Sequence, residues 1–191
     1  MDADFSVELG RDDPVLDCPW TDPDGKFTYF DLKHRPELLE QVGEAKQFPE
    51  LREFLRAVNS NLSAVESAKC DAWTTGDLSP EEEIFGASRK FSSYVDLVFS
   101  LRDHRESFSF HERFAKRLVE LLRQTPETPS AAEVSIRRGF YAEEEKAREG
   151  CYFTIYVSGY GDDEDRARQN WEIALRLVAH AVLQLSVTDG T

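Results

Sequence analysis

The sequence predicts an α+β fold in which two strand-strand-helix units form a four-stranded antiparallel sheet with helices on one face, preceded by an N-terminal helical pair. Residues 91–101 alternate between apolar and polar side chains, which is typical of a strand in a sheet covered on one face. Residues 110–122 and 171–185 instead repeat apolar side chains with the period of a helix. The order strand-strand-helix occurs twice along the chain, which predicts two units of the same architecture.

The N-terminal part of the chain is rich in turn-forming Asp, Pro and Gly, so we expect an irregular lead-in over residues 1–35. Pro36 suits the first turn of a helix, and Pro49 suits the start of a second one. The second helix has apolar side chains at the spacing i, i+3, i+4, i+7, namely Leu51, Phe54, Leu55 and Val58. Residues 36–60 are therefore predicted as the helical pair, at the start of a single domain over residues 36–191.

The first strand-strand-helix unit is expected over residues 64–125. Its strands are residues 66–75 and 91–101, which both alternate with a period of two. Ser109 and Glu112 have the spacing of a capping box at the start of the following helix. Pro126 follows the last apolar residue of the helical stripe and is expected to end it.

The second unit is expected over residues 131–187. Val134 and Ile136 mark one strand, residues 151–157 mark the next, and the final helix contains the stripe over 171–185. The acidic run at 162–165 suits the positive end of that helix dipole. Matching positions lie sixty residues apart with few identities, which indicates a repeated architecture without establishing a duplication.

Charge excludes two classes of partner. The 191 residues include 37 Asp and Glu against 23 Lys and Arg, a formal net charge of −14. Binding of nucleic acid is driven largely by a surplus of basic residues, and docking to anionic membranes needs one as well. We therefore expect neither nucleic acid nor a membrane as a partner.

The N-terminus lacks the basic start and apolar run of a signal peptide, and no apolar stretch approaches the roughly 20 residues of a membrane span. Cys18, Cys70 and Cys151 stand at no metal-binding spacing. We expect a cytoplasmic protein with reduced thiols. No zinc-protease, dinucleotide, P-loop or nucleophile-elbow motif is complete, so no metal and no cofactor is predicted.

The polar face of the predicted sheet is unusually aromatic. It carries the residues that we predict to bind a partner: Trp73, Tyr94, Arg137, Tyr141, Tyr152, Tyr156 and Tyr160. Trp and Tyr combine a large apolar area with a polar tip and are enriched at interfaces. They also favour strands and stabilise them by cross-strand pairing, so the pattern fits an ordinary sheet as well. The charged residues of this face are nearly balanced, with Lys69, Lys90 and Arg137 against Asp71, Asp96 and Glu133.

A second set of residues could carry catalysis. His104 lies between a predicted strand and helix, and His111 and Glu112 lie in the first turn of that helix. If the connection folds back, the two imidazoles could meet near a carboxylate and act as acid and base or bind a metal. The bland interpretation is that both are surface histidines in a charged loop.

Two functions follow from these patterns. The first is a non-catalytic binding or regulatory domain whose aromatic sheet face holds a protein partner, a second copy of the chain or a ligand. The alternative is a small enzyme with its site around His104 and His111. The sequence leaves open the strand order, and it leaves open whether residues 1–60 cover the aromatic face.

Overall fold

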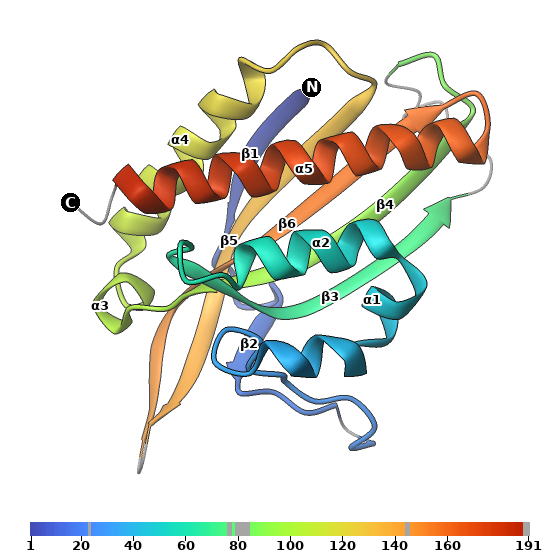
Figure 1. Ribbon diagram of the computed structural model, residues 1–191. Helices are drawn as coiled ribbons and strands as arrows, with labels where there is room; N and C mark the ends of the chain where they lie inside the picture. The colour runs from blue at the N-terminus through green and yellow to red at the C-terminus, as the bar shows by residue number, and fades with distance from the viewer. Residues whose placement is uncertain (23, 76–77, 79–84, 144–145, 189–191) are drawn as a thin grey trace.

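The computed structural model describes residues 1–188 except 23, 76–77, 79–84 and 144–145. A single sheet organises the chain (Figure 1). Its strands are β1 (Asp2–Glu8), β2 (Val15–Cys18), β3 (Val65–Thr75), β4 (Arg89–Phe99), β5 (Ser130–Glu143) and β6 (Lys146–Gly161). The order across the sheet is β1-β5-β6-β4-β3, and β2 pairs with β5 beyond the end of β1. β1 and β2 run parallel to β5, whereas the pairs β5–β6, β6–β4 and β4–β3 are antiparallel.

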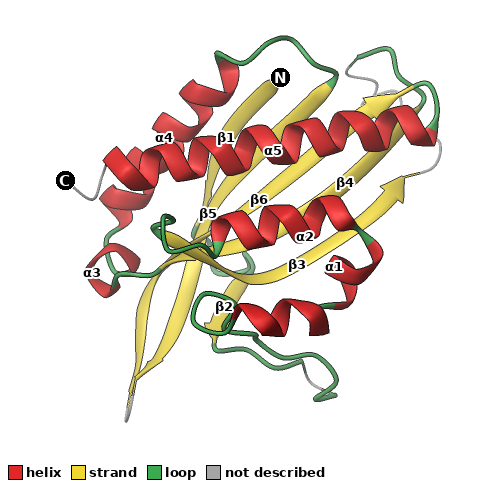
Figure 2. Cartoon of the chain, viewed as in Figure 1, coloured by secondary structure: helices red, strands yellow, loops and turns green. Residues whose placement is uncertain are grey.

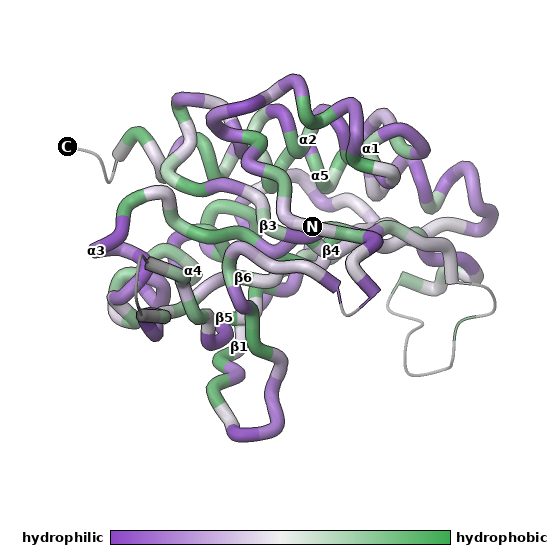
Figure 3. The backbone as a smooth tube through the Cα atoms, turned by 90° about the horizontal axis from the view of Figure 1, so that it is seen from below, coloured by the Kyte–Doolittle hydropathy of each residue, from purple (hydrophilic) through white to green (hydrophobic). Residues whose placement is uncertain are grey.

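The helices gather on one face of this sheet. They are the 3-10 helix η1 (Pro36–Gln41) and the α-helices α1 (Gly43–Gln47), α2 (Pro49–Val58), α3 (Arg102–Arg105), α4 (Phe108–Arg123) and α5 (Glu164–Thr188). Figure 2 shows α2 and α5 in front of the strands and α4 beside β1, and Figure 3, viewed at right angles, has α2 and α5 on the same side of the strands. The opposite face has no helix among the described residues.

The predicted four-stranded antiparallel sheet is wrong, because the sheet has six strands and two of them are parallel to β5. The N-terminal segment is not a helical pair either. Residues 1–35 contribute β1 and β2, and residues 36–60 hold one 3-10 helix and two α-helices. The added strands were missed for a physical reason. Both pair with a strand more than 120 positions away, so no hairpin turn in the neighbouring sequence indicates that they are strands.

The core lies between the sheet and the helices, and α5 makes the most extensive contact with the sheet. Trp171 is fully buried, its ring centroid lies 4.5 Å from that of Phe91, and its indole N–H donates to the Ser93 hydroxyl at 2.9 Å. Gly159 in β6 allows this approach, since a Cβ there would overlap the backbone N of Trp171 and the backbone O of Ala167. The close contact of β6 with α5 therefore depends on a residue without a side chain.

We predict that Gly159→Ala lowers the free energy of unfolding by about 1–3 kcal/mol, because the added methyl group must push α5 away from β6. Urea denaturation of the purified proteins measures this change. Gly43→Ala is the matched control, since a Cβ at Gly43 meets nothing within 4 Å. Equal unfolding midpoints for the two variants would show that the close approach at Gly159 costs nothing to relieve.

Candidate functional site

The register of the sheet arranges the side chains of the helix-free face in rows that cross the strands. The central row runs from β1 through β5, β6 and β4 to β3 and consists of Asp4, Glu133, Tyr156, Tyr94 and Asp71. Each of these residues is the direct partner of the next, and side chains opposite each other on one face are close enough to interact. Two tyrosines are thus flanked by carboxylates on both sides.

Three aromatic rings follow one another along this part of the face. The centroid of Tyr94 lies 6.0 Å from that of Tyr156 and 6.3 Å from that of Trp73. We call Trp73, Tyr94 and Tyr156 the aromatic strip. The Trp73 side chain is 38% exposed, whereas the two tyrosines are half-buried. Burial raises the pKa of Tyr94 far above its ordinary value, so this hydroxyl stays neutral.

The next two rows hold a buried polar network. The Thr154 hydroxyl donates to the Asp96 carboxylate at 2.6 Å and accepts a hydrogen bond from Arg137 at 2.9 Å. Arg137 also donates to the Tyr156 hydroxyl at 3.3 Å and to the Glu8 carboxylate of β1 at 2.7 Å. Because a buried guanidinium needs compensating acceptors, Glu8 and Thr154 account for the burial of Arg137. The network fixes the position of Tyr156 in the aromatic strip.

Asp96 is the acid of this network whose pKa is raised by burial. Its side chain is 6% exposed, and burial raises its pKa to about 6, although the Thr154 hydrogen bond and the charges of Lys69 and Arg137 act in the opposite direction. A carboxyl group with a raised pKa binds its proton more tightly in the folded than in the unfolded chain. Asp96 therefore stabilises the fold less as the pH rises through 6.

The other half of the helix-free face is covered by the chain itself. Leu16, Cys18, Trp20 and Tyr29 form an apolar cluster with Ala68, Val98, Tyr141 and Tyr152. The Trp20 indole donates to the Ala68 carbonyl at 2.7 Å, and the Tyr141 hydroxyl donates to the Cys151 carbonyl at 2.5 Å. Residues 15–22 and 24–30 thus seal this half. Their edge reaches the β3 side of the aromatic strip, where Trp20 and Lys26 line one pocket with Tyr94. They leave uncovered the half around Trp73 and Tyr156. We call this uncovered half the open half.

The seven residues predicted for partner binding consequently have different surroundings. Trp73, Tyr94 and Tyr156 form the aromatic strip, and Arg137 holds the network beneath it. Tyr160 is 3% exposed and packs 5.2 Å from Phe85. The remaining two, Tyr141 and Tyr152, lie in the covered half and do not face solvent.

A hollow of about 410 Å³ lies on the open half. Its lining includes Trp73, Tyr156 and Tyr160 on one side and residues of β1 and β5 on the other, among them Asp2, Asp4 and Glu133. The hollow therefore has an aromatic side, which also carries Lys90, and an acidic side. Its size suits a few side chains of a partner or a small ligand.

Three acidic residues of this face come from a strand that sequence reasoning missed. β1 places Asp2, Asp4 and Glu8 on the same face as the aromatic strip. The available signal was the alternation of residues 2–8, in which Ala3, Phe5 and Val7 occupy every second position. With β1 in place the face is acidic, and the near balance of charge expected from β3 to β6 alone does not describe it.

The carboxylates of the open half differ in how they are paired. Asp4 lies 3.6 Å from Arg123, and Glu8 is bound to Arg137. Within the described part of the chain, Asp2, Asp71 and Glu133 have no ion-pair partner. These three unpaired carboxylates lie on both sides of the aromatic strip, two toward β1 and one on β3.

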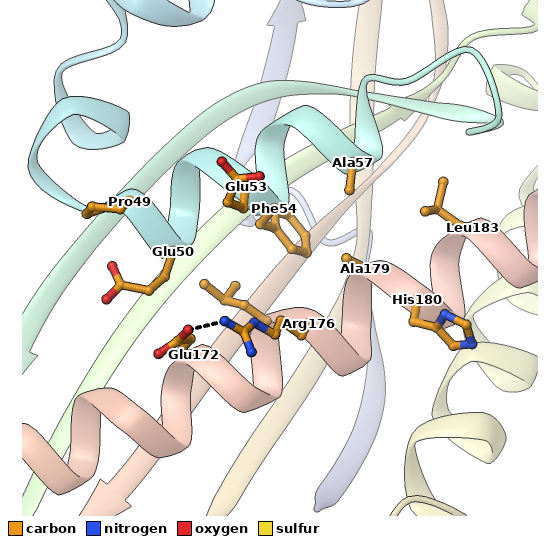
Figure 4. A pocket seen from close by; sticks show the side chains of 11 residues that line it. Pro49, Glu50, Glu53, Phe54, Ala57, Glu172, Arg176, Ala179, His180 and Leu183 are labelled. Carbon is orange, nitrogen blue, oxygen red and sulfur yellow. Dashed lines mark hydrogen bonds and ion pairs between the residues drawn. The ribbon is translucent and has the colours of Figure 1, made fainter.

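A groove between α2 and α5 provides a comparison on the helical side of the molecule (Figure 4). It has a volume of about 480 Å³ and an apolar floor that includes Phe54 and Leu175. Each glutamate of its rim has an arginine partner: Glu50 with Arg168, Glu53 with Arg56 and Glu172 with Arg176. The charges of this groove are therefore compensated within the chain.

The histidines of the alternative hypothesis are packed among aromatic rings. His111 is fully buried, its Nδ1 lies 2.9 Å from the Ser107 carbonyl, and burial lowers its pKa to about 4. His104 stacks on Phe110 with ring centroids 3.8 Å apart. Glu112 is on the outer side of α4, where it binds Lys116 at 2.8 Å.

The structure thus does not bring His104, His111 and Glu112 together around a cavity that it describes. Among the described residues, no group of three or more His, Cys, Asp or Glu could hold a metal ion. The enzyme hypothesis stays a prediction.

A scan against models of protein families, a search of curated proteins and a search of solved structures each found no match. None of the helices in the described parts of the chain is long and apolar enough to cross a membrane.

We predict that Asp96→Asn changes the pH dependence of stability. Wild-type protein should lose unfolding free energy as the pH rises from 4 through 6, because ionised Asp96 is buried at a cost. Asn cannot ionise, so the stability of the variant relative to wild type should rise by roughly 2 kcal/mol between pH 4 and 7.5. Urea denaturation at a series of pH values measures this difference, and parallel profiles for the two proteins would contradict it.

Proposed function

We propose that this chain is a non-catalytic binding domain whose open half docks a segment of a partner protein. The observation that carries the proposal is the aromatic strip, three neighbouring rings beside a hollow of about 410 Å³. Exposed Trp and Tyr side chains that gather around a concave surface are typical of binding hot spots.

The contrast between the two halves of the face supports this proposal. Residues 15–30 bury Tyr141 and Tyr152 in an apolar cluster, so the chain has the means to cover aromatic residues of its sheet. The same segment does not cover Trp73, which stays 38% exposed in a strand. Trp73 is therefore exposed because it lies in the open half, although the lead-in buries aromatic residues elsewhere on the same face.

The hydrogen bonds that hold Tyr156 in the aromatic strip also support a binding role. Arg137 and Thr154 tie Tyr156 to Glu8 and Asp96 through hydrogen bonds of 2.6–3.3 Å. A ring held in place by such a network loses little conformational entropy when a partner binds. Tyr156 is therefore part of a preorganised surface.

A partner of different sequence fits this face better than a second copy of the chain. A symmetric dimer through the open half would bring the same patch of both copies together. Asp2, Asp71 and Glu133 of one copy would then face the same acidic patch of the other, and each copy carries a net charge of −14. Like charges brought together across an interface are unfavourable.

A cytoplasmic location is part of this proposal. The cysteines Cys18, Cys70 and Cys151 are free thiols, which fits a reducing compartment. Burial raises the pKa of Cys18 to about 11 and that of Cys70 to about 12, so neither is activated as a nucleophile.

We predict that peptides selected by the wild-type protein from a random library displayed on phage depend on Trp73. Trp73→Ala should weaken their binding at least about fivefold, because truncation of a hot-spot tryptophan removes its contacts with the partner. Fluorescence anisotropy with the selected peptides measures the effect.

Phe108→Ala is the matched control, since Phe108 is also 38% exposed but begins α4 on the other side of the molecule. Light scattering on both variants and the wild type tests self-association. Selected peptides that bind the two variants equally well would contradict the proposal. A wild-type dimer that dissociates in Trp73→Ala would instead identify the face as a self-interface and would overturn the choice of partner.

A further inference from the structure

We infer that the partner segment is basic, and that its Lys or Arg side chains are held between the aromatic strip and the unpaired carboxylates Asp2, Asp71 and Glu133. This inference rests on the proposed function and names the chemistry of its partner. Charge complementarity is the argument that carries it.

The rows of the sheet offer a cation two kinds of favourable contact at once. Glu133 is the direct cross-strand partner of Tyr156, and Asp71 is the direct partner of Tyr94. Neighbouring strands lie roughly 4.8 Å apart, so a cation above either ring is also near a carboxylate. A cation over the face of Trp or Tyr is attracted by the ring quadrupole, and a carboxylate at its side adds a direct Coulombic attraction.

The basic residues of the chain that lie near the strip make other contacts. Lys90 lines the hollow, and its ammonium lies 5.9 Å from the centroid of the Tyr160 ring. Lys26, which lines a pocket with Asp71, lies 3.3 Å from Asp24. The Lys69 ammonium lies 4.7 Å from the centroid of the Trp20 ring, at the border of the covered half. Arg137 is bound to Glu8, and Arg123 lies beside Asp4 and donates to the Ala3 carbonyl. None of them pairs with Asp2, Asp71 or Glu133 within the described residues. A cation from outside the chain is therefore the complementary group.

The groove between α2 and α5 shows that acidic side chains as such do not make this site. Its glutamates Glu50, Glu53 and Glu172 are each paired with an arginine (Figure 4 draws the last pair). A basic partner would have to displace those arginines, and it would find no exposed tryptophan among the lining residues. The two surfaces thus provide a test and a control within one molecule.

The experiment uses fluorescein-labelled, acetylated peptides in which glycine alternates with lysine, glutamate or serine. The lysine peptide should bind the full chain with saturable anisotropy, at least about tenfold more tightly than the serine peptide. The glutamate peptide should not bind. Binding of the lysine peptide should weaken as ionic strength rises, because salt screens its attraction to the solvent-exposed carboxylates.

Two variants test the site and one tests its location. Asp71→Asn/Glu133→Gln should weaken binding of the lysine peptide roughly fivefold, and Trp73→Ala should weaken it roughly threefold. Glu53→Gln/Glu172→Gln removes the same charge from the helical groove and should change the affinity by less than about twofold. Thermal unfolding of every variant shows that each one is folded.

Several outcomes would overturn the inference. They are equal binding of the lysine and serine peptides, no saturable binding of the lysine peptide, or an equal loss of affinity in the control double variant. If library peptides without basic residues bind and still depend on Trp73, the inference fails and the proposed function stands. If no peptide of either kind depends on Trp73, the proposed function fails as well.

Discussion

The hydrogen bonding of one strand edge determines what the helix-free face contains. β5 is 14 residues long, and the backbone groups on its side away from β6 need partners. β1 pairs with β5 from Ala131 to Arg137, and β2 continues from Arg138 to Tyr141. After β2 the chain must cross the sheet to reach η1, and in doing so it covers the half around Tyr141. The same pairing leaves the carboxylates of β1 beside the uncovered tyrosines.

The carboxylates of β1 have two different roles as a consequence. Glu8 binds Arg137 and makes the burial of that guanidinium possible, so it belongs to the buried polar network that holds Tyr156. Asp2 lies at the rim of the hollow and has no ion-pair partner in the described residues. A single strand therefore supplies both the charge that stabilises the site and a charge that remains for a partner. This division of roles is what turns a nearly balanced aromatic face into an acidic one.

Much of the site could be predicted from local periodicity. The alternation in β4 and β6 assigns Tyr94 and Tyr156 to the face opposite the helices, and the structure has both of them there. The same reasoning could not find that Tyr141 and Tyr152 are buried, because their cover is residue 16 and its neighbours, more than 120 positions earlier. Contacts of this range leave no trace in a periodic pattern, since periodicity reports only how a segment divides its own two faces.

The sequence by itself determined which residues alternate, which segments are amphipathic helices, and that the chain carries a large negative charge. It did not determine how many strands share the sheet, since strand pairing depends on backbone groups that every residue has in common. Only the tertiary structure decided that β1 and β2 both pair with β5 and that one half of the face is covered. It also decided which carboxylates have a basic partner, because an ion pair depends on distance in space and Asp4 reaches Arg123 from 119 positions away.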